Sequence, residues 1–507
     1  MFIVIDFGSQ YTQLIARRLR ELNVYSLIYP SYVKIEELKD KNVEGIILSG
    51  GPFSVYDETM NIDKRILEMG IPILGICYGF QLLAKLLGGE VKRGEKGEYG
   101  LTKIKIVKNS ILLEGLEKEE IVWMSHQDIV VKLPEDFIPI AYSENNFIAG
   151  AESINYPFYA LQFHPEVSHT QKGKEILRNF VFKICKAKES WNLDKFVEES
   201  IREIRDKVGD KKVLLALSGG VDSSTLAVLL QKSIGNNLTA IFVDHGLLRE
   251  GEKEEVEKAL RSLGVNLVSI DCKKNFLEKL KGIKDPEEKR KIIGHEFVRI
   301  FEEKSKEFGP FQFLAQGTLY PDVIESAKSL TGKPSKIKTH HNVGGLPENL
   351  NFEILEPFKF LFKDEVRKIA KILNLPENII KRQPFPGPGL AVRIIGEITE
   401  ERLNILRKAD TILQEELKNW DEYEKIWQSF AVLLPIKSVG VKGDQRSYEY
   451  TIAIRIVESE DGMTAQWVKV PYNLLEKIST RIVNEVSGVN RVVYDITNKP
   501  PATIEWE

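Results

Sequence analysis

Short apolar runs alternate with helical spacing of apolar residues through the first two thirds of the chain. In the first third, the runs are Phe2–Phe7, Gly45–Leu48 and Ile71–Ile76, and Gln10–Leu22 has helical spacing. Such runs are typical of strands buried on both faces of a parallel sheet, and their alternation with helices is typical of β-α-β units. The pattern therefore predicts an α/β fold. Further strands are predicted at 103–107, 121–124, 137–141 and 158–163, and a closing helix at 171–186.

A second α/β pattern begins after the polar stretch 187–193, where we place a domain boundary. Strands are predicted at 213–217, 240–243, 267–270 and 313–315, and helices at 194–207, from 221, at 252–263 and at 286–308. The proline- and glycine-rich stretch Gln383–Gly389 is a hinge that no helix or strand can cross. We therefore divide the chain into domains 1–189, 190–382 and 383–507.

The pattern after the hinge changes to that of a small α+β unit. Helices are predicted at 399–417 and 472–486, and strands at 429–441, 448–457 and 491–496. The strand 448–457 has a clear period of two. Nothing in the composition of this unit indicates a function.

Composition narrows the class of protein. A length of 507 residues fits about three domains, and the net charge of −3 does not point to nucleic acid or membrane partners. The three cysteines, Cys77, Cys185 and Cys272, lie far apart and fit a reducing cytoplasm. The first residues predict a strand rather than a signal peptide, and no apolar run approaches the ~20 residues that span a bilayer. The 29% of charged residues hint weakly at a heat-adapted source.

The strand predicted at Val213–Leu217 ends at Ser218-Gly219-Gly220, and the next helix starts near Val221. A glycine turn between a strand and a helix aims backbone N–H groups and the helix dipole at one point, which favours a phosphate. No lysine follows the glycines as in a Walker A loop, and Asp222 instead suggests a bridging Mg²⁺. The alternative is an ordinary strand–turn–helix corner made of small residues.

A second turn of chemical interest is Gly75-Ile-Cys77-Tyr-Gly79, which lies between a predicted strand and a predicted helix. Its order matches a nucleophile elbow, in which flanking glycines permit the sharp turn that exposes the central side chain. A thiol at a helix N-terminus also ionises more readily. The alternative is a small buried cysteine inside a strand.

A nucleophile of this kind needs a base and a group that orients the base. The first third contains His126, His164 and His169. His164 follows a predicted strand, and Glu166 can reach the second nitrogen of its ring. We therefore favour a catalytic set of Cys77, His164 and Glu166 over an isolated surface or core histidine.

Gly50-Gly-Pro52, Gly75-Ile-Cys-Tyr-Gly79 and Phe163-His-Pro-Glu166 together resemble the class I glutamine amidotransferases, which release ammonia from glutamine. The resemblance implies that Cys77 attacks the amide, His164 transfers protons and Glu166 orients His164. It also implies that backbone N–H groups near Gly51 and Tyr78 bind the oxyanion and that Gln81 contacts glutamine.

The middle domain resembles the ATP pyrophosphatases with a PP-loop, which are doubly wound α/β proteins. The resemblance assigns ATP contacts to the loop and to two later positions: Ser218, Gly219, Gly220, Val221, Asp222, Ser223, Ser224, Val243 and Gly317. It makes Asp222 and Asp322 the carboxylates that hold Mg²⁺.

The stretch 328–347 lacks regular periodicity and contains Lys336, Lys338, His340 and His341. Long irregular loops inside domains are usually functional or disordered, and basic residues between glycines suggest a lid over phosphates. The alternative is a solvated loop with scattered lysines.

An amidotransferase fused to an ATP pyrophosphatase passes ammonia to an acceptor that ATP has adenylylated. Three motifs narrow the family: Lys338–Gly345, Gln383–Arg393 and Lys499–Glu507 resemble GMP synthetases, which convert XMP to GMP. The resemblance implies a homodimer formed through the C-terminal domain, and XMP contacts from Arg290, Gln428, Asp444, Arg446, Lys499 and Glu505. Gln445 and Gly462 stand where the family commonly shows Gly and Phe, and neither replaces a residue to which the resemblance assigns a charge or a proton.

Two other classes stay open at this point. Another amidating ligase with a PP-loop is one, although residue 2 is Phe rather than the N-terminal cysteine of asparagine synthetase, and an NAD synthetase would lack the hinge and the Ile-Glu-Trp-Glu tail. A catalytically inactive sensor of glutamine or nucleotide is the other, and it would have a broken triad or a broken phosphate loop.

Overall fold

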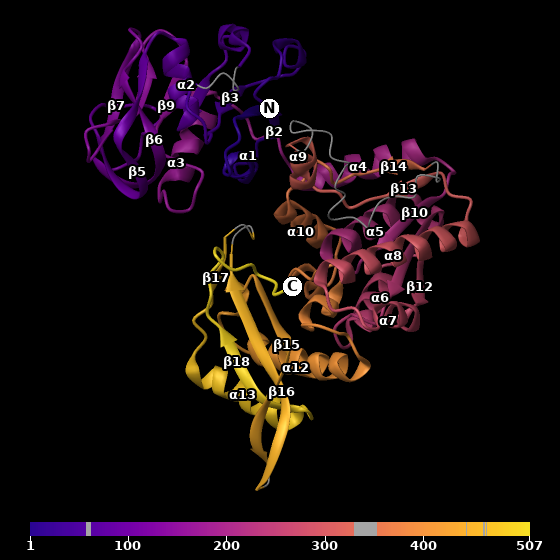
Figure 1. Cartoon of the computed structure of the whole chain (residues 1–507). Coiled ribbons are helices and arrows are strands. Elements are labelled where there is room, and N and C mark those ends of the chain that lie inside the picture. Colours follow the sequence, from indigo (N-terminus) through magenta and orange to yellow (C-terminus); the bar gives the residue numbers. More distant parts are fainter. Residues whose placement is uncertain (57–61, 329–351, 443, 460–461, 463) are drawn as a thin grey trace. The chain divides into compact units, whose positions relative to one another are not determined.

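The chain forms two compact units in the computed structural model, Met1–Asn192 and Leu193–Glu507. The structure describes residues 1–56, 62–328, 352–442, 444–459, 462 and 464–507 (Figure 1). The division of the second unit into domains 190–382 and 383–507 stays a prediction. Within the described residues, no helix combines the length and the apolar character that a membrane crossing requires.

One mixed sheet organises the first unit, with strand order β2-β1-β3-β4-β9-β8-β7-β5-β6. The strands from β2 to β9 in this order pair in parallel, and those from β9 to β6 pair antiparallel. The strands are β1 (Phe2–Asp6), β2 (Ser26–Pro30), β3 (Gly45–Leu48), β4 (Ile73–Ile76), β5 (Glu90–Ile106), β6 (Glu119–Lys132), β7 (Phe137–Ser143), β8 (Ile148–Ser153) and β9 (Phe158–Leu161).

The helices of the first unit are α1 (Thr12–Glu21), α2 (Tyr78–Leu86) and α3 (Gly173–Arg178), with short 3-10 turns η1 (Ile35–Glu37) and η2 (Lys64–Glu68). The closing helix predicted at 171–186 is shorter than expected, because α3 passes into a π-helical turn, η3 (Asn179–Ile184). Phe180 and Val181 of this turn are fully buried, so the change of helical pitch accompanies the packing of this segment.

A parallel sheet with strand order β12-β11-β10-β13-β14 organises the N-terminal portion of the second unit. Its strands are β10 (Val213–Leu217), β11 (Leu238–Asp244), β12 (Leu267–Asp271), β13 (Phe313–Ala315) and β14 (Glu353–Leu355). The helices are α4 (Leu193–Val208), α5 (Val221–Ile234), α6 (Glu252–Ser262), α7 (Lys273–Leu280), α8 (Pro286–Phe308), α9 (Tyr320–Lys328), α10 (Lys363–Ile372) and α11 (Glu377–Ile380), with a 3-10 turn η4 (Gly235–Asn237). The C-terminal ends of β10 and β11 therefore lie side by side, which is where α/β sheets bind ligands.

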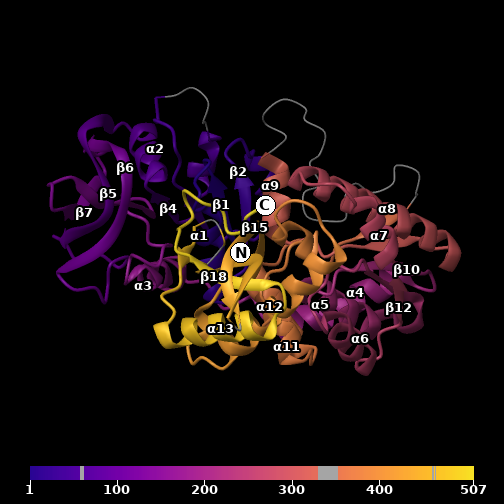
Figure 2. The same ribbon diagram turned by 60° about the horizontal axis from the view of Figure 1, so that its bottom comes forward.

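The C-terminal portion of the second unit is another sheet with two helices beside it. Strands β15 (Gln428–Lys442) and β16 (Gln445–Glu458) form a long hairpin, and β16 also pairs with β17 (Gln466–Trp467) and β18 (Val489–Asp495). Helix α12 (Glu400–Lys418) packs on β15 and α13 (Tyr472–Glu485) on β18, as Figures 1 and 2 both show. The 3-10 turns η5 (Gly389–Arg393) and η6 (Tyr423–Lys425) flank α12.

The strand predicted at 448–457 exists within β16, and most of it is buried on both faces. Every residue from Tyr450 to Val457 is buried. One face packs in the core with residues of α12 and α13. The other is covered by the tail, residues 499–507, where Ile504 packs against Phe430, Val432 and Ala453. Covering by a distant segment hides the alternation that the sequence displays.

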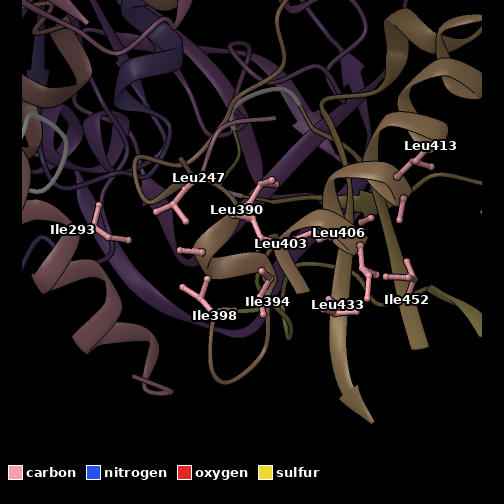
Figure 3. Close-up of a cluster of buried hydrophobic side chains, with 14 of the residues drawn as sticks. Leu247, Ile293, Leu390, Ile394, Ile398, Leu403, Leu406, Leu413, Leu433 and Ile452 are labelled. Atoms are coloured by element: carbon pink, nitrogen blue, oxygen red, sulfur yellow. The ribbon is translucent and has the colours of Figure 1, made fainter. Parts of the chain in front are cut away.

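One hydrophobic core joins the parallel sheet to the C-terminal sheet. Leu247 and Ile293 from the N-terminal portion of the unit pack in the same cluster as Leu390, Leu433 and Ile452 from its C-terminal portion (Figure 3). Figure 3 shows Leu390 and Ile394, which follow the proline–glycine hinge, with Leu247 and Ile293 on one side of them and Leu433 and Ile452 on the other. The first unit has a separate core centred on Ile3, Ile5 and Phe80.

Candidate active sites

Cys77 occupies the turn between β4 and α2 and has a left-handed φ of +52°. The two flanking glycines are required by close backbone approach. A Cβ at Gly79 would lie 2.3 Å from the carbonyl oxygen of Leu48, and one at Gly75 would lie 2.7 Å from the carbonyl oxygen of Gly79. The positive φ of Cys77 is a conformation that costs a non-glycine residue about 1–3 kcal/mol and is typical of functional turns. The turn therefore has the features of a nucleophile elbow.

His164 follows β9, and its ring is fixed from one side by Glu166. The distance from His164 Nδ1 to Glu166 Oε1 is 2.7 Å, and both side chains are buried. Thr170 Oγ1 donates to the backbone carbonyl of His164 at 2.6 Å, which holds the residue in place. The second oxygen of Glu166, Oε2, is buried without a hydrogen-bond partner in the described structure, so this carboxylate is directed chiefly to the imidazole.

The electrostatics of this pair favour a protonated imidazole. Burial on its own lowers the pKa of His164, but the charges of Glu166 and Cys77 and hydrogen bonds to both outweigh it, and the pKa is raised well above its usual value. An imidazolium beside a thiol stabilises the thiolate that a nucleophile needs. The geometry and the electrostatics thus both fit Cys77 as a nucleophile, His164 as a group that transfers protons and Glu166 as the group that orients His164.

A cavity of about 710 Å³ lies over these residues in the first unit. Cys77, His164, Gly51 and Gln81 all line it. Gln81 Nε2 donates to the backbone carbonyl of Asp128 at 2.8 Å, so its amide is oriented in advance. The ring of Tyr78 is buried against Phe7, and only its backbone is left for a role at the cavity. The cavity has room for an amino acid substrate.

Helix α1 also contributes to this site, which the sequence pattern did not indicate. The ring of Tyr11, just before α1, meets the His164 ring edge-on with centroids 5.0 Å apart, and Tyr11 lines the cavity. Arg18 Nε on α1 donates to the backbone carbonyl of Glu166 at 3.0 Å. Both contacts span about 150 residues of sequence, and no local motif marks them.

The predicted phosphate loop lies between β10 and α5, and its residues hydrogen-bond to one another. Ser218 Oγ and Ser223 Oγ lie 2.9 Å apart, and Ser223 Oγ also donates to the carbonyl of Gly220 at 3.2 Å. Gly219 has a left-handed φ of +79°. Ser224 Oγ is buried without a hydrogen-bond partner among the described atoms. The loop is a compact cradle of hydroxyl and N–H groups at the start of a helix, which fits an anion.

Asp222 gives the cradle an oxygen that fits a divalent cation. Its Oδ1 is buried and has no hydrogen-bond partner within the described part of the chain. Burial raises the pKa of Asp222; Lys363 and Arg367 oppose the rise, and the charge of Asp322 adds to it. Two neighbouring carboxylates of this kind are ligands that Mg²⁺ takes together with phosphate oxygens.

Lys363 is a residue of this site that the sequence pattern did not single out. Its Nζ lies 3.7 Å from Asp222 Oδ2. It begins α10, more than a hundred residues after the loop, so sequence distance hid it. Gly317 lies at the loop as expected, because a Cβ there would be 3.9 Å from the backbone of Asp222 and Ser223. Val243 is buried near the end of the neighbouring strand β11.

Four of the residues assigned to XMP lie around the tail. Gln428 Nε2 donates to Glu505 Oε1 at 2.7 Å. The backbone of Lys499 pairs with that of Ala465, which directly precedes β17. The Nζ of Lys499 donates to the carbonyl of Gly462. Arg290 pairs with Glu287 at 2.7 Å and donates to the backbone oxygen of Glu507.

Arg393 is a further residue at the tail that the sequence pattern did not single out. Its fully buried guanidinium binds Glu505 through two hydrogen bonds of 2.8 and 3.1 Å. It also lies over the ring of Phe430, with its carbon 4.0 Å from the ring centroid. The carboxylate of Glu505 is therefore held in a fixed orientation before any ligand arrives.

Asp444 and Arg446 lie apart from this group within one chain. They stand at the turn of the β15–β16 hairpin, whereas Gln428 pairs with Val457 at its other end. The stretch of β16 between Arg446 and Val457 spans roughly 36 Å at the usual rise of ~3.3 Å per residue. The structure does not bring these two residues to Gln428 and Glu505 in the same molecule. Lys336, Lys338, His340 and His341 lie outside the described residues, so the lid stays a prediction.

The fold and these sites define a class, an amidotransferase unit fused to a PP-loop unit. Family models agree: residues 3–184 match "Glutamine amidotransferase class-I", 193–289 match "PP-loop domain" and 415–506 match "GMP synthase C terminal domain". The chain is 58% identical to a GMP synthase (glutamine-hydrolyzing) of Aquifex aeolicus over 506 residues, with 100% of this chain and 99% of the relative covered. It is also 58% identical to that of Carboxydothermus hydrogenoformans (100% and 99% covered) and 55% identical to that of Brachyspira hyodysenteriae (100% and 98%). The chain belongs to the glutamine-hydrolyzing GMP synthase family.

Proposed function

We propose that this chain makes GMP from XMP, ATP and glutamine. The observation that carries the proposal is the presence, in one member of this family, of two intact sites: the Cys77–His164–Glu166 arrangement at a cavity and the Ser218–Ser224 cradle. A sensor that had lost catalysis would be expected to lack one of them. Glutamine supplies the nitrogen, and ATP supplies the activation of the acceptor.

In the first unit, the Cys77 thiolate attacks the side-chain amide carbon of glutamine. His164 gives a proton to the departing ammonia and then takes one from the water that hydrolyses the thioester to glutamate. Glu166 keeps the ring oriented through the 2.7 Å contact to Nδ1. Backbone N–H groups of Gly51 and Tyr78 serve as the oxyanion donors, a contribution of about 3–4 kcal/mol in comparable sites.

In the second unit, an oxygen of XMP attacks the α-phosphorus of ATP and pyrophosphate departs. The hydroxyl and N–H groups of Ser218–Ser224 hold the pyrophosphate oxygens, and Lys363 is placed to neutralise negative charge beside them. Asp222 and Asp322 would hold Mg²⁺, which supplies further neutralisation of phosphate charge when bound. Ammonia then displaces AMP from the adenylylated XMP to give GMP.

The XMP site and the oligomer are linked in this proposal. Gln428, Lys499 and Glu505 contact XMP from one chain, and Asp444 and Arg446 from the hairpin of a second copy, because within one chain they lie too far away. The hairpin face that carries Arg446 supports a homodimer. Val439 pairs with Tyr448 and Val441 with Arg446, so these side chains share a face, and the three apolar ones are more than half exposed.

Product analysis of two variants tests the proposal. Wild-type protein should give AMP and pyrophosphate from XMP and ATP with either glutamine or ammonium. Cys77→Ala should abolish the glutamine-dependent reaction and keep the ammonium-dependent one, because it removes only the nucleophile. Asp222→Asn should reduce both reactions by ~10²-fold or more, as loss of a positioning and charge-neutralising group does. Formation of ADP and phosphate, or glutaminase activity in Cys77→Ala, would contradict the assignment.

A further inference from the structure

Arg382 is the last residue before the proline–glycine hinge and reaches back to the phosphate loop. Its Nη1 donates to the carbonyl oxygen of Gly219 at 2.7 Å, across 163 residues of sequence. The same guanidinium pairs with Glu252 at 3.2 Å, and both side chains are largely buried, at 13% and 7% exposure. Neither sequence pattern nor the reaction steps above assign it a role.

The bond to Gly219 fixes the orientation of one peptide plane. In a planar trans peptide, the carbonyl of Gly219 and the N–H of Gly220 point in opposite directions. With the carbonyl held by Arg382, the N–H of Gly220 faces the inside of the loop, where it meets Ser218 Oγ at 3.4 Å. Two successive glycines rotate freely, so without the bond to Arg382 the described structure holds this plane only through the long 3.4 Å contact between the Gly220 N–H and Ser218 Oγ.

The residue after Arg382 continues the connection toward the tail. Gln383 Oε1 accepts from the backbone N–H of Ser429 at 2.8 Å. The neighbouring Gln428 donates to the carbonyl of Pro384 at 3.1 Å and to Glu505 at 2.7 Å. Hydrogen bonds and the short covalent segment Arg382–Pro384 therefore connect the phosphate loop to the carboxylate assigned to XMP.

We propose that Arg382 is a positioning residue of the synthetase reaction. It holds the Gly219–Gly220 peptide so that an N–H group faces the phosphates of ATP, and with Gln383 it ties this loop to the strand that carries Gln428. Arg382 thereby keeps the α-phosphate of ATP correctly placed relative to the XMP oxygen that attacks it. The inference rests on the proposed function, because it requires that the loop binds ATP and that Gln428 and Glu505 contact XMP.

Kinetics of Arg382→Gln and Arg382→Lys test this role in the full-length protein with ammonium as nitrogen source. Misplacement of reacting groups by about 1 Å costs ~10²-fold in rate. Arg382→Gln should therefore lower kcat and XMP-dependent exchange of pyrophosphate into ATP by ~10²-fold, with the KM for ATP changed by only a few-fold. The rate of Arg382→Lys should lie between those of this variant and wild type. An ammonium group still reaches the Gly219 carbonyl, but it cannot reproduce the planar guanidinium contacts with both Gly219 and Glu252. Glutaminase activity at Cys77 should be unchanged.

Two matched variants separate positioning from a structural role. Arg481→Gln breaks ion pairs of Arg481 with Glu415, Glu416 and Glu485, remote from the loop, and should leave kcat near wild type. Glu252→Gln removes the charge beside Arg382 but leaves the bond to Gly219, and should keep most of the rate.

Three results would overturn the inference: an Arg382→Gln enzyme as fast as wild type, a loss that is entirely in the KM for ATP, or an equal loss in Glu252→Gln. If Arg382→Gln does not fold, the Lys variant decides by the same criteria. If the wild-type protein itself forms no AMP and pyrophosphate, the proposed function fails, and that outcome is distinct from failure of the positioning role.

Discussion

His164 is contacted on three sides by groups that act differently. Glu166 binds Nδ1, the Tyr11 ring meets the imidazole edge-on, and Cys77 is the partner whose thiolate the imidazolium stabilises. Because the opposing charges of Glu166 and Cys77 outweigh burial, the imidazolium persists to higher pH than it would in water. The alkaline limit of glutamine hydrolysis therefore depends on Glu166.

Glu166→Gln should move that limit to lower pH. The glutamine side chain keeps the shape but removes the charge that raises the pKa of His164, so the ring loses its proton earlier as pH rises. The alkaline limb of kcat/KM for glutamine should shift downward, and the rate at alkaline pH should fall by up to ~10²-fold. Measurement of glutaminase rates across pH checks this.

A second buried pair in the same sheet offers the control. His126 Nε2 lies 3.1 Å from Glu98 Oε2, and both side chains are as buried as those of the catalytic pair. Glu98→Gln should leave the alkaline limb in place even if the rate changes. An unmoved limb in Glu166→Gln, or an equal shift in Glu98→Gln, would show that Glu166 does not set the protonation of His164.

Sequence motifs identify single site residues that lie close together in the chain, and they miss residues that the fold brings together from distant positions in the chain. The turn around Cys77 and the pair His164–Glu166 are local patterns, so they could be selected before the fold was known. Tyr11, Lys363 and Arg393 are each separated by one hundred residues or more from the site residue that they contact. The sequence around a single tyrosine, lysine or arginine does not indicate such a distant contact. Their roles come from the three-dimensional packing alone.

The tail Lys499–Glu507 behaves as a structural element, although most of it has no regular secondary structure. Arg455 donates to the carbonyl of Thr503 at 3.1 Å, and Ile504 packs in a cluster with Phe430. The buried Lys289 pairs with Glu507, and the buried Arg393 with Glu505. Removal of the whole tail would take the carboxylate partner from two buried cations, at a cost of about 3–5 kcal/mol each, so single substitutions test it better.

Glu505→Gln should raise the KM for XMP by ~10–100-fold, because loss of a charge-assisted hydrogen bond costs about 1.5–3 kcal/mol. The KM for ATP and the glutaminase rate should change little. Trp506→Ala is the neighbouring control: this side chain is 41% exposed and donates to Asp495 rather than to the XMP group. Equal effects of the two substitutions on the KM for XMP would contradict a specific role for Glu505.

At the scale of elements, some segments were predicted with exact bounds, among them the three-residue strand β13, and others were missed. The strands β3 and β10 and helix α8 have the predicted bounds. Strand β2 and helices α7 and α10 were missed. Each has ten residues or fewer, and a segment of that length owes much of its conformation to the sheet or helices that it packs on. Strand β16 shows a further limit, since its second face is buried by a tail that comes nearly fifty residues later.

The whole molecule has one surface that the proposed function leaves to a second copy. Val439, Val441 and Tyr448 on the hairpin are exposed apolar side chains beside Arg446. If two hairpins pair, Arg446 of each copy is carried away from its own tail and toward the other one. Each XMP site would then be completed by two chains.

Mixing of two inactive variants tests this arrangement. Arg446→Ala and Asp222→Asn homodimers should both be poor in GMP synthesis. In a mixed dimer, one site combines an intact Asp222 with the intact Arg446 of the other chain, so about half of the mixed dimers' sites should recover activity. No recovery after confirmed subunit exchange would show that Arg446 acts within its own chain or not at all. Arg491→Ala, an exposed arginine on β18, should not affect XMP binding.

The shared core of the second unit sets where this protein could be divided between separate genes. A break between residues 192 and 193 would fall between units that each have their own apolar core. A break at the proline–glycine hinge would separate Leu247 and Ile293 from Leu390 and Leu433, which pack together, and each such side chain gains about 1.5–3 kcal/mol from burial. Evolution could therefore release the amidotransferase as an independent subunit, whereas the phosphate loop and the XMP strands must be inherited on one polypeptide.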